Sequence, residues 1–243
     1  SKALWTLAIP IMFGMGIQTL YNLVDMIFIG KLGGQAITGI AFNMPLFFLV
    51  LGLTMGLGTG VTASIARFIG QENKKQADNS AEHAVFMAAI ISVFLSLIGL
   101  MFGKTILAFF GAEGEILNLG WEYLRVMCIG MPFMIFSGFF RSILAGEGDM
   151  KFPMMIAGLG TVLNIILDPI FIFELESYGG FGFGLGIAGA AMATVISQVI
   201  VFFVFIYMLF FKDHSYITFR LRDFSFSTDI IWDIVKIGLP ASL

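Results

Sequence analysis

The sequence predicts an all-α polytopic membrane protein that forms a bundle of six transmembrane helices. Hydrophobic residues make up 58% of the 243 positions, charged residues only 12%, and the mean hydropathy is +0.97. A water-soluble domain carries about 25% charged residues. The apolar residues also form runs of about 20 or more, long enough for a helix to cross a hydrocarbon layer about 30 Å thick. A transmembrane β-barrel is excluded, because its strands are only about 10 residues of alternating polarity.

Six apolar stretches give the order of the predicted helices: residues 4–30, 36–66, 84–110, 121–146, 153–173 and 184–211. A seventh begins near residue 230. LAIPIMF at 7–13 and IGLPASL at 237–243 each hold a proline in fourth place, which indicates a weak internal repeat. The chain is therefore predicted to consist of a six-helix lobe at 1–211, a cytoplasmic linker at 212–229 and the start of a second lobe at 230–243.

Basic residues are distributed unequally between the two sides of the predicted bundle. With the N-terminus inside, the inner segments hold ten of the 13 Lys and Arg residues, and the outer side holds only Lys31, Lys104 and Arg125. Because cytoplasmic segments are enriched in Lys and Arg, the N-terminus is predicted to be cytoplasmic. We expect an integral protein of the cytoplasmic (plasma) membrane, surrounded by lipid.

The second span ends in the small-residue string GLTMGLGTGVTASIA, residues 52–66. Gly52, Gly56 and Gly60 recur every four residues, which predicts a helix face that packs closely against another helix. The connection that follows, RFIGQENKKQADNSAEHA at 67–84, is predicted to be a solvated loop with a short amphipathic helix rather than a regulatory site.

Two carboxylates fall well inside the predicted spans, Asp25 in the first and Asp168 in the fifth. A charged group at the centre of a bilayer costs about 2.5–3.5 kcal/mol, so each predicts a functional role. Both lie about five residues before the outer end of a span, which is roughly 7–8 Å deep at a rise of 1.5 Å per residue. Two carboxylates at one depth can share a proton or a cation. A structural ion pair is the alternative, but Lys31 is the only cation near Asp25 in the sequence, and the fifth span has none.

Other polar residues recur at the same depth. Asn164 lies four residues before Asp168 on the same helix face, and Thr194 lies about ten residues inside the sixth span. The first span carries a polar stripe at spacings of three and four, made of Gln18, Tyr21, Asn22 and Asp25. A carboxamide, a hydroxyl and two carboxylates are therefore predicted to converge in the outer half of the bundle.

Two prolines interrupt these helices, Pro10 in the first span and Pro169 directly after Asp168. Proline lacks an N–H, so the carbonyl four residues earlier loses its helix partner. We expect both prolines to be bending points beside a cavity, with a simple packing kink as the alternative.

No motif indicates an enzyme, a cofactor or a nucleic-acid partner. The sequence has no nucleophile–base pair, no zinc spacing and no basic stripe with interleaved aromatic residues. FGFGLGIAG at 181–189 lacks the Lys-Ser/Thr that completes a phosphate loop. His83 and His214 are isolated and predict no metal site.

Together the motifs resemble one family, the multidrug and toxic compound extrusion (MATE) transporters. AIPIMFGMGIQTLYNLVDMIFIGKLG at 8–33 is similar to the family's first helix, and GLGTGVTASIARFIGQEN at 56–73 resembles the end of its second, although Arg67 stands where many members carry Gln. RSILAGEGDMKFP at 141–153 resembles the loop before the fifth helix. LNIILDPIFIF at 163–173 and GIAGAAMAT at 186–194 match the fifth and sixth helices.

The resemblance implies a fold of twelve helices in two six-helix lobes, of which this chain is the N-terminal lobe plus the start of helix seven. It implies that small organic, mostly cationic drugs or toxic compounds are exported in exchange for Na⁺ or H⁺, and that the chain requires its own C-terminal lobe. The implied cation or proton site is Asp25, Asn164, Asp168 and Thr194. Gln18 and Tyr21, with Asn22 on the same stripe, would line the adjoining substrate cavity.

Three alternatives stay open. A flippase for lipid-linked saccharides, from the same superfamily, would favour a cleft rich in Arg or Lys, whereas the predicted cleft holds carboxylates. A membrane-embedded enzyme would need a nucleophile or a metal motif, and an ion channel would need a loop that acts as a filter. Na⁺ and H⁺ both stay open as the coupling ion.

Overall fold

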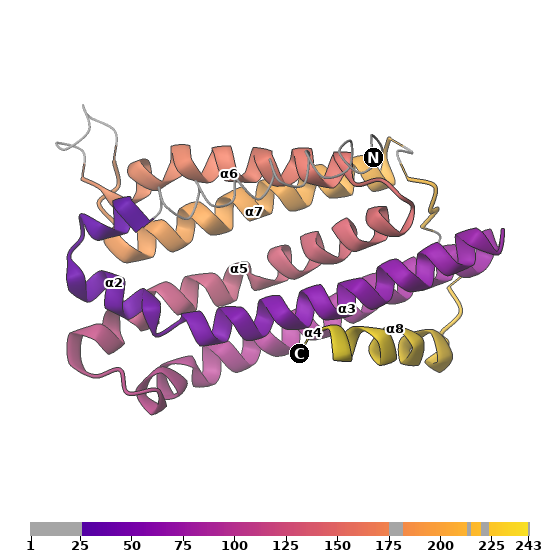
Figure 1. Cartoon of the computed structure of the whole chain (residues 1–243). Helices are drawn as coiled ribbons and strands as arrows, with labels where there is room; N and C mark the ends of the chain where they lie inside the picture. The colour runs from indigo at the N-terminus through magenta and orange to yellow at the C-terminus, as the bar shows by residue number, and fades with distance from the viewer. Residues whose placement is uncertain (1–25, 175–181, 213–214, 220–223, 243) are drawn as a thin grey trace, which may run out of the picture. The chain divides into compact units, whose positions relative to one another are not determined.

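The computed structural model describes residues 26–174, 182–212, 215–219 and 224–242. Apart from one isolated bridge between Glu174 and Phe183, the regular structure in these residues is helical. The helices in chain order are α2 (Gly34–Ala41), α3 (Met44–Gly70), α4 (Lys74–Phe109), α5 (Gly114–Gly146), α6 (Lys151–Ile172), α7 (Gly186–Phe210) and α8 (Thr228–Ala241) (Figure 1).

Five stretches of the described residues are long and apolar enough to cross a membrane: Gly34–Gly70, Lys74–Phe109, Gly114–Gly146, Lys151–Ile172 and Gly186–Phe210. They correspond to the second to sixth predicted spans. Of the first predicted span, only the helical end at 26–30 is described. The predicted class, an all-α polytopic membrane protein, is confirmed.

Burial in these helices follows the pattern of a membrane protein. The apolar stretch of α4 is the most hydrophobic of the five but only 17% of it is buried, whereas that of α5 is the least hydrophobic and 50% buried. Phe94 and Met101 of α4, for example, are 61% and 72% exposed. Exposing so many large apolar side chains to water is unfavourable, whereas exposing them to the hydrocarbon of a membrane is not.

The prediction of a solvated loop at 67–84 is wrong. α3 continues to Gly70, and only Gln71, Glu72 and Asn73 separate it from α4. The side chain of Asn73 accepts a hydrogen bond from the backbone N–H of Gln76 at 3.2 Å, so it caps the first turn of α4. Hydropathy predicts only the apolar part of a helix. Both α3 and α4 extend beyond their apolar parts into the polar segment at 67–84.

The chain forms two compact units, each built from parts of several helices. The first comprises residues 1–44, 98–130 and 154–201, of which the described part starts at Met26. Within it, α6 and the first part of α7 run side by side (Figure 1). α2 approaches α5 closely: a Cβ atom on Gly39 would lie 3.0 Å from the backbone nitrogen of Gly120. The buried amide of Asn43 joins the same two segments, because it donates to the carbonyls of Gly39 and Gly120 at 2.8 and 3.1 Å.

The second unit comprises residues 45–97, 131–153 and 202–243, and in it α8 lies against α3 (Figure 1). A Cβ atom on Gly60 would lie 2.1 Å from the carbonyl oxygen of Ile234, and one on Gly56 would lie 2.5 Å from that of Gly238. Only glycine permits so close an approach. The predicted close-packing face of 52–66 is therefore confirmed, and its partner is α8.

Candidate cation site in the first unit

The structure brings Asn164, Asp168 and Thr194 together, all within the first unit. The amide nitrogen of Asn164 lies 3.3 Å from Asp168 Oδ1, one helical turn further along α6. The same nitrogen lies 3.2 Å from Thr194 Oγ1 on α7. Both contacts have the amide as donor, so the carboxylate and the hydroxyl oxygen accept.

All three side chains are buried. Asp168 has no exposed surface, Asn164 is 2% exposed and Thr194 8%. A carboxylate removed from water keeps its charge only where a counter-charge or several donors compensate, and otherwise binds a proton. A cation or H⁺ that reached such a site would compensate the charge of the carboxylate.

The orientation of Asn164 decides what its oxygen can do. Its two N–H groups face Asp168 and Thr194, so the carbonyl oxygen Oδ1 points away from both. Oδ1 is buried and accepts no hydrogen bond from any residue that the structure describes. A buried amide oxygen is rarely left in that condition. If the amide turned over, this oxygen would face the carboxylate and the hydroxyl, and three such oxygens suit a hard cation such as Na⁺, which prefers oxygen ligands.

Close contact between α6 and α7 sets the position of Thr194. A Cβ atom on Gly189 would lie 2.3 Å from the carbonyl oxygen of Phe171, so α7 rests directly on the last turn of α6. A Cβ atom on Gly130 of α5 would likewise meet Val195, the neighbour of Thr194, at 2.3 Å. These two glycines support the site and were not singled out from the sequence. The small-residue string GIAGAAMAT was the available signal for Gly189.

Pro169 is the second proline predicted to bend a helix. It lies inside α6, which ends three residues later at Ile172. The backbone N–H of Phe173 still reaches the carbonyl of Pro169 at 3.4 Å, so the chain leaves the helix gradually. The proline thus lies between the buried carboxylate of Asp168 and the end of the helix.

The remaining predicted site residues lie outside the described part of the chain: Pro10, Gln18, Tyr21, Asn22 and Asp25. The first residues after them are described and contact Phe173, the residue that follows α6. The ring of Phe28 packs edge-on against that of Phe173 with 6.0 Å between centroids, and the ammonium of Lys31 lies 5.5 Å from the same Phe173 ring.

The comparisons with known proteins agree on one family. A family model described as MatE matches residues 10–170. The chain belongs to the MatE family. It is 31% identical over its whole length to the multidrug export protein MepA of Staphylococcus aureus and covers 52% of that protein. It is 30% identical over its whole length to the probable multidrug resistance protein NorM of Thermotoga maritima, of which it covers 51%.

Solved structures give the same relationship. A crystal structure of MATE in complex with MaD3S superimposes on 99% of this MatE chain with a TM-score of 0.91 at 40% sequence identity, and the chain covers 52% of it. An outward-facing multidrug resistance MATE family transporter superimposes with a TM-score of 0.89 at 39% identity. The chain thus spans about half the length of these relatives, as expected for the N-terminal lobe of a MATE transporter.

Proposed function

We propose that this MatE chain is the first lobe of a cation-coupled antiporter that exports organic, mostly cationic compounds by alternating access. The observation that carries the proposal is the buried group of Asn164, Asp168 and Thr194, with an amide oxygen that needs a partner. The relatives named for multidrug export and multidrug resistance support the substrate class. No enzyme reaction and no cofactor belong to the proposal.

Asp25 completes the proposed cation site. Phe28, three residues after it, packs against Phe173, which lies five residues after Asp168. We therefore assign the coupling ion to Asp25, Asn164, Asp168 and Thr194.

The proposed cycle depends on the charge of these carboxylates. With the cavity open to the outside, Na⁺ or H⁺ enters and offsets part of the negative charge that Asp25 and Asp168 share. Neutral groups cost far less to bury, so the cavity lined by Gln18, Tyr21 and Asn22 can close as the first helix bends at Pro10. Substrate leaves outward, and the two lobes rock to the inward-open state. Pro169 gives the end of α6 the matching freedom.

The whole cycle requires a second lobe. Transport by two lobes that move against each other needs both, and this chain spans about half of its relatives. We accordingly assign residues 1–211 to the first lobe, 212–229 to the linker and the rest to the second lobe. The predicted distribution of Lys and Arg supports a cytoplasmic N-terminus in the cytoplasmic membrane.

The experiment is transport by the full-length parent in proteoliposomes. A fluorescent organic cation is loaded, and its movement is followed while a Na⁺ or an H⁺ gradient is imposed. Movement driven by one gradient supports the antiporter and identifies the ion. Movement of a lipid-linked saccharide without any response of the organic cation would instead support the flippase.

A further inference from the structure

Residues 215–219 and 224–227 of the linker lie outside any helix, so their backbone N–H and C=O groups need partners elsewhere. Side chains of the second unit provide them. Four of these side chains come from the first turns of α4: Lys74, Asp78, Asn79 and His83. A fifth is Glu147, directly after α5.

The first part of the linker is held at three residues. Glu147 accepts hydrogen bonds from the backbone N–H groups of Tyr216 and Ile217 at 3.0 and 3.2 Å. Lys74 donates to the carbonyl of Tyr216 at 2.6 Å, and Asp78 accepts from the N–H of Thr218 at 3.0 Å. Bonds to charged side chains are about twice as strong as neutral ones.

The second part of the linker is held just before α8. Asn79 binds both backbone groups of Ser225: its amide donates to the carbonyl at 2.9 Å, and its oxygen accepts from the N–H at 3.2 Å. His83 Nε2 accepts from the N–H of Ser227 at 2.8 Å.

The hydrogen bonds set the tautomer of His83. Its Nδ1 lies 2.7 Å from the carbonyl oxygen of Asn79, which can only accept, so Nδ1 carries the proton and Nε2 is the acceptor for Ser227. The ring has no exposed surface, and the rings of Phe224 and Phe226 lie 4.9 and 5.8 Å from it. Water has little access to this bond.

Ser227 is also the N-cap residue, which directly precedes α8. Its hydroxyl accepts from the N–H of Ile230 at 3.4 Å, which caps the helix. Further along, α8 contacts α3 through glycines and one exposed ion pair between Arg67 and Asp233. An exposed pair contributes little to stability, so the contact between α3 and α8 depends on helix packing. The buried hydrogen bond between Ser227 and His83 costs more free energy to break, because the backbone N–H would be left without a partner.

We propose that His83 is a positioning residue for transport: it fixes Ser227 on α4 as the pivot of α8, and the linker stays on the first lobe while the second lobe moves. This inference rests on the proposed function, because a pivot matters only if the lobes rock. It assigns the linker a defined mechanical role. The distal part of α8 moves, and its first residue does not.

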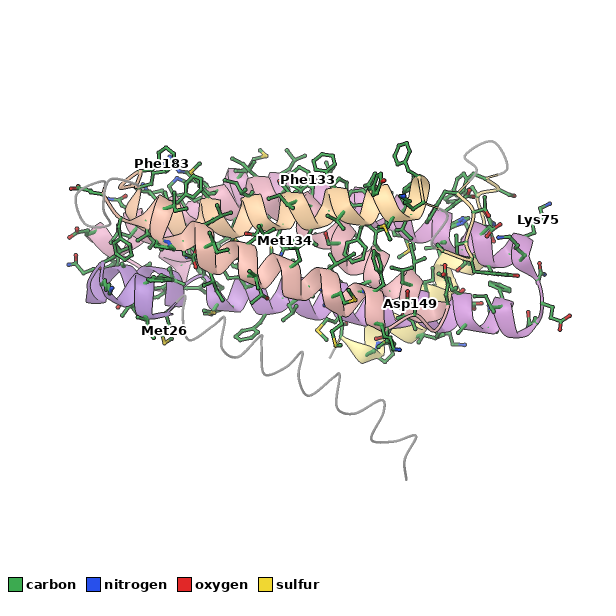
Figure 2. All side chains as sticks on the ribbon, turned by 90° about the horizontal axis from the view of Figure 1, so that it is seen from above. Met26, Lys75, Phe133, Met134, Asp149 and Phe183 are labelled. Atoms are coloured by element: carbon green, nitrogen blue, oxygen red, sulfur yellow. The ribbon has the colours of Figure 1, made fainter. Side chains whose placement is uncertain are left out.

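Hydrogen exchange in the full-length parent tests the contact without reference to transport. In peptides that span 224–230, His83→Leu should exchange about fivefold faster, the loss expected for one hydrogen bond. His83→Gln retains an acceptor and should restore much of the protection. Lys75→Ala is the matched control, since Lys75 is exposed and projects outward from the first turn of the same helix (Figure 2). Equal exchange in wild type and His83→Leu would overturn the proposal.

Spin labels test the pivot itself. Labels at Lys75 and Thr228 should keep one distance with or without substrate and coupling ion, whereas labels at Lys75 and the 53% exposed Leu239 should change distance. Equal changes in both pairs, or a constant distance in both while the protein exports substrate, would overturn the pivot. Absence of export by the wild type would instead overturn the proposed function, and the exchange result would still stand.

Discussion

The amide of Asn164 donates to the hydroxyl of Thr194 at 3.2 Å, which joins α6 to α7 across 30 residues of sequence. The same amide lies 3.3 Å from the carboxylate of Asp168. Thr194 therefore helps to orient Asn164, and Asn164 in turn faces the buried charge. This arrangement makes the hydroxyl part of the proposed cation site in two ways, as a ligand and as an anchor for its neighbour.

Replacing Thr194 with Val tests that double role. Valine has the same shape but accepts no hydrogen bond, so one buried N–H of Asn164 loses its partner at a cost of about 1–3 kcal/mol. We expect the coupling ion to bind about tenfold more weakly, measured as the Na⁺ concentration or the pH that gives half-maximal efflux. Thr194→Ser retains the hydroxyl and should behave like the wild type. Equal ion dependence in the Val and Ser variants would remove Thr194 from the site.

Replacing Gly189 with Ala tests the packing that places Thr194. The new methyl group would lie 2.3 Å from the carbonyl oxygen of Phe171, so α7 must shift away from α6. We expect a loss of about 1–3 kcal/mol in stability, the usual cost of overpacking, measured as a lower melting temperature in detergent. Gly158→Ala is the matched control, because a Cβ atom there would meet no described atom within 4 Å apart from its chain neighbours and the nearby backbone of α6. A Gly189→Ala variant as stable as this control would contradict the contact.

Replacing Gly60 with Ala tests the contact between α3 and α8. A methyl group there would lie 2.1 Å from the carbonyl oxygen of Ile234 and must separate the helices. We expect the full-length parent to melt at a lower temperature and a disulfide engineered between α3 and α8 to form more slowly. Gly70→Ala, at a position with no neighbour within 4 Å, should change neither. An unchanged disulfide rate in Gly60→Ala would show that α8 lies elsewhere.

Periodic features of this chain were readable from the sequence. Long apolar runs predicted the spans, because lipid-facing and buried positions are both apolar in a membrane helix. The fourfold spacing of Gly56 and Gly60 predicted a close-packing face, but not that α8 would fill it, since that helix lies about 170 residues further on. The spacing of Asn164 and Asp168 likewise gave a common face, and the structure supplies the contact with Thr194.

Other features left no periodic signal. The sequence places His83 in a loop as an isolated histidine. In the structure it is fully buried and accepts a hydrogen bond from the backbone N–H of Ser227, 144 residues away. Its partner is a backbone group, which any residue type has, so no sequence pattern identifies it. The same reason explains why Asp78 and Asn79 were assigned to a solvated loop: their partners are the backbone groups of Thr218 and Ser225.

The most direct test of the account is efflux of a fluorescent organic cation from vesicles that hold the full-length parent, with Asp168→Asn compared with the wild type under imposed Na⁺ and H⁺ gradients. Asparagine has nearly the same shape as aspartate but carries no charge and does not titrate. We expect the wild type to respond to one gradient and the variant to respond to neither, which assigns coupling to Asp168 and names the ion. A variant that transports as well as the wild type would make the buried carboxylate structural and would place coupling in the other lobe.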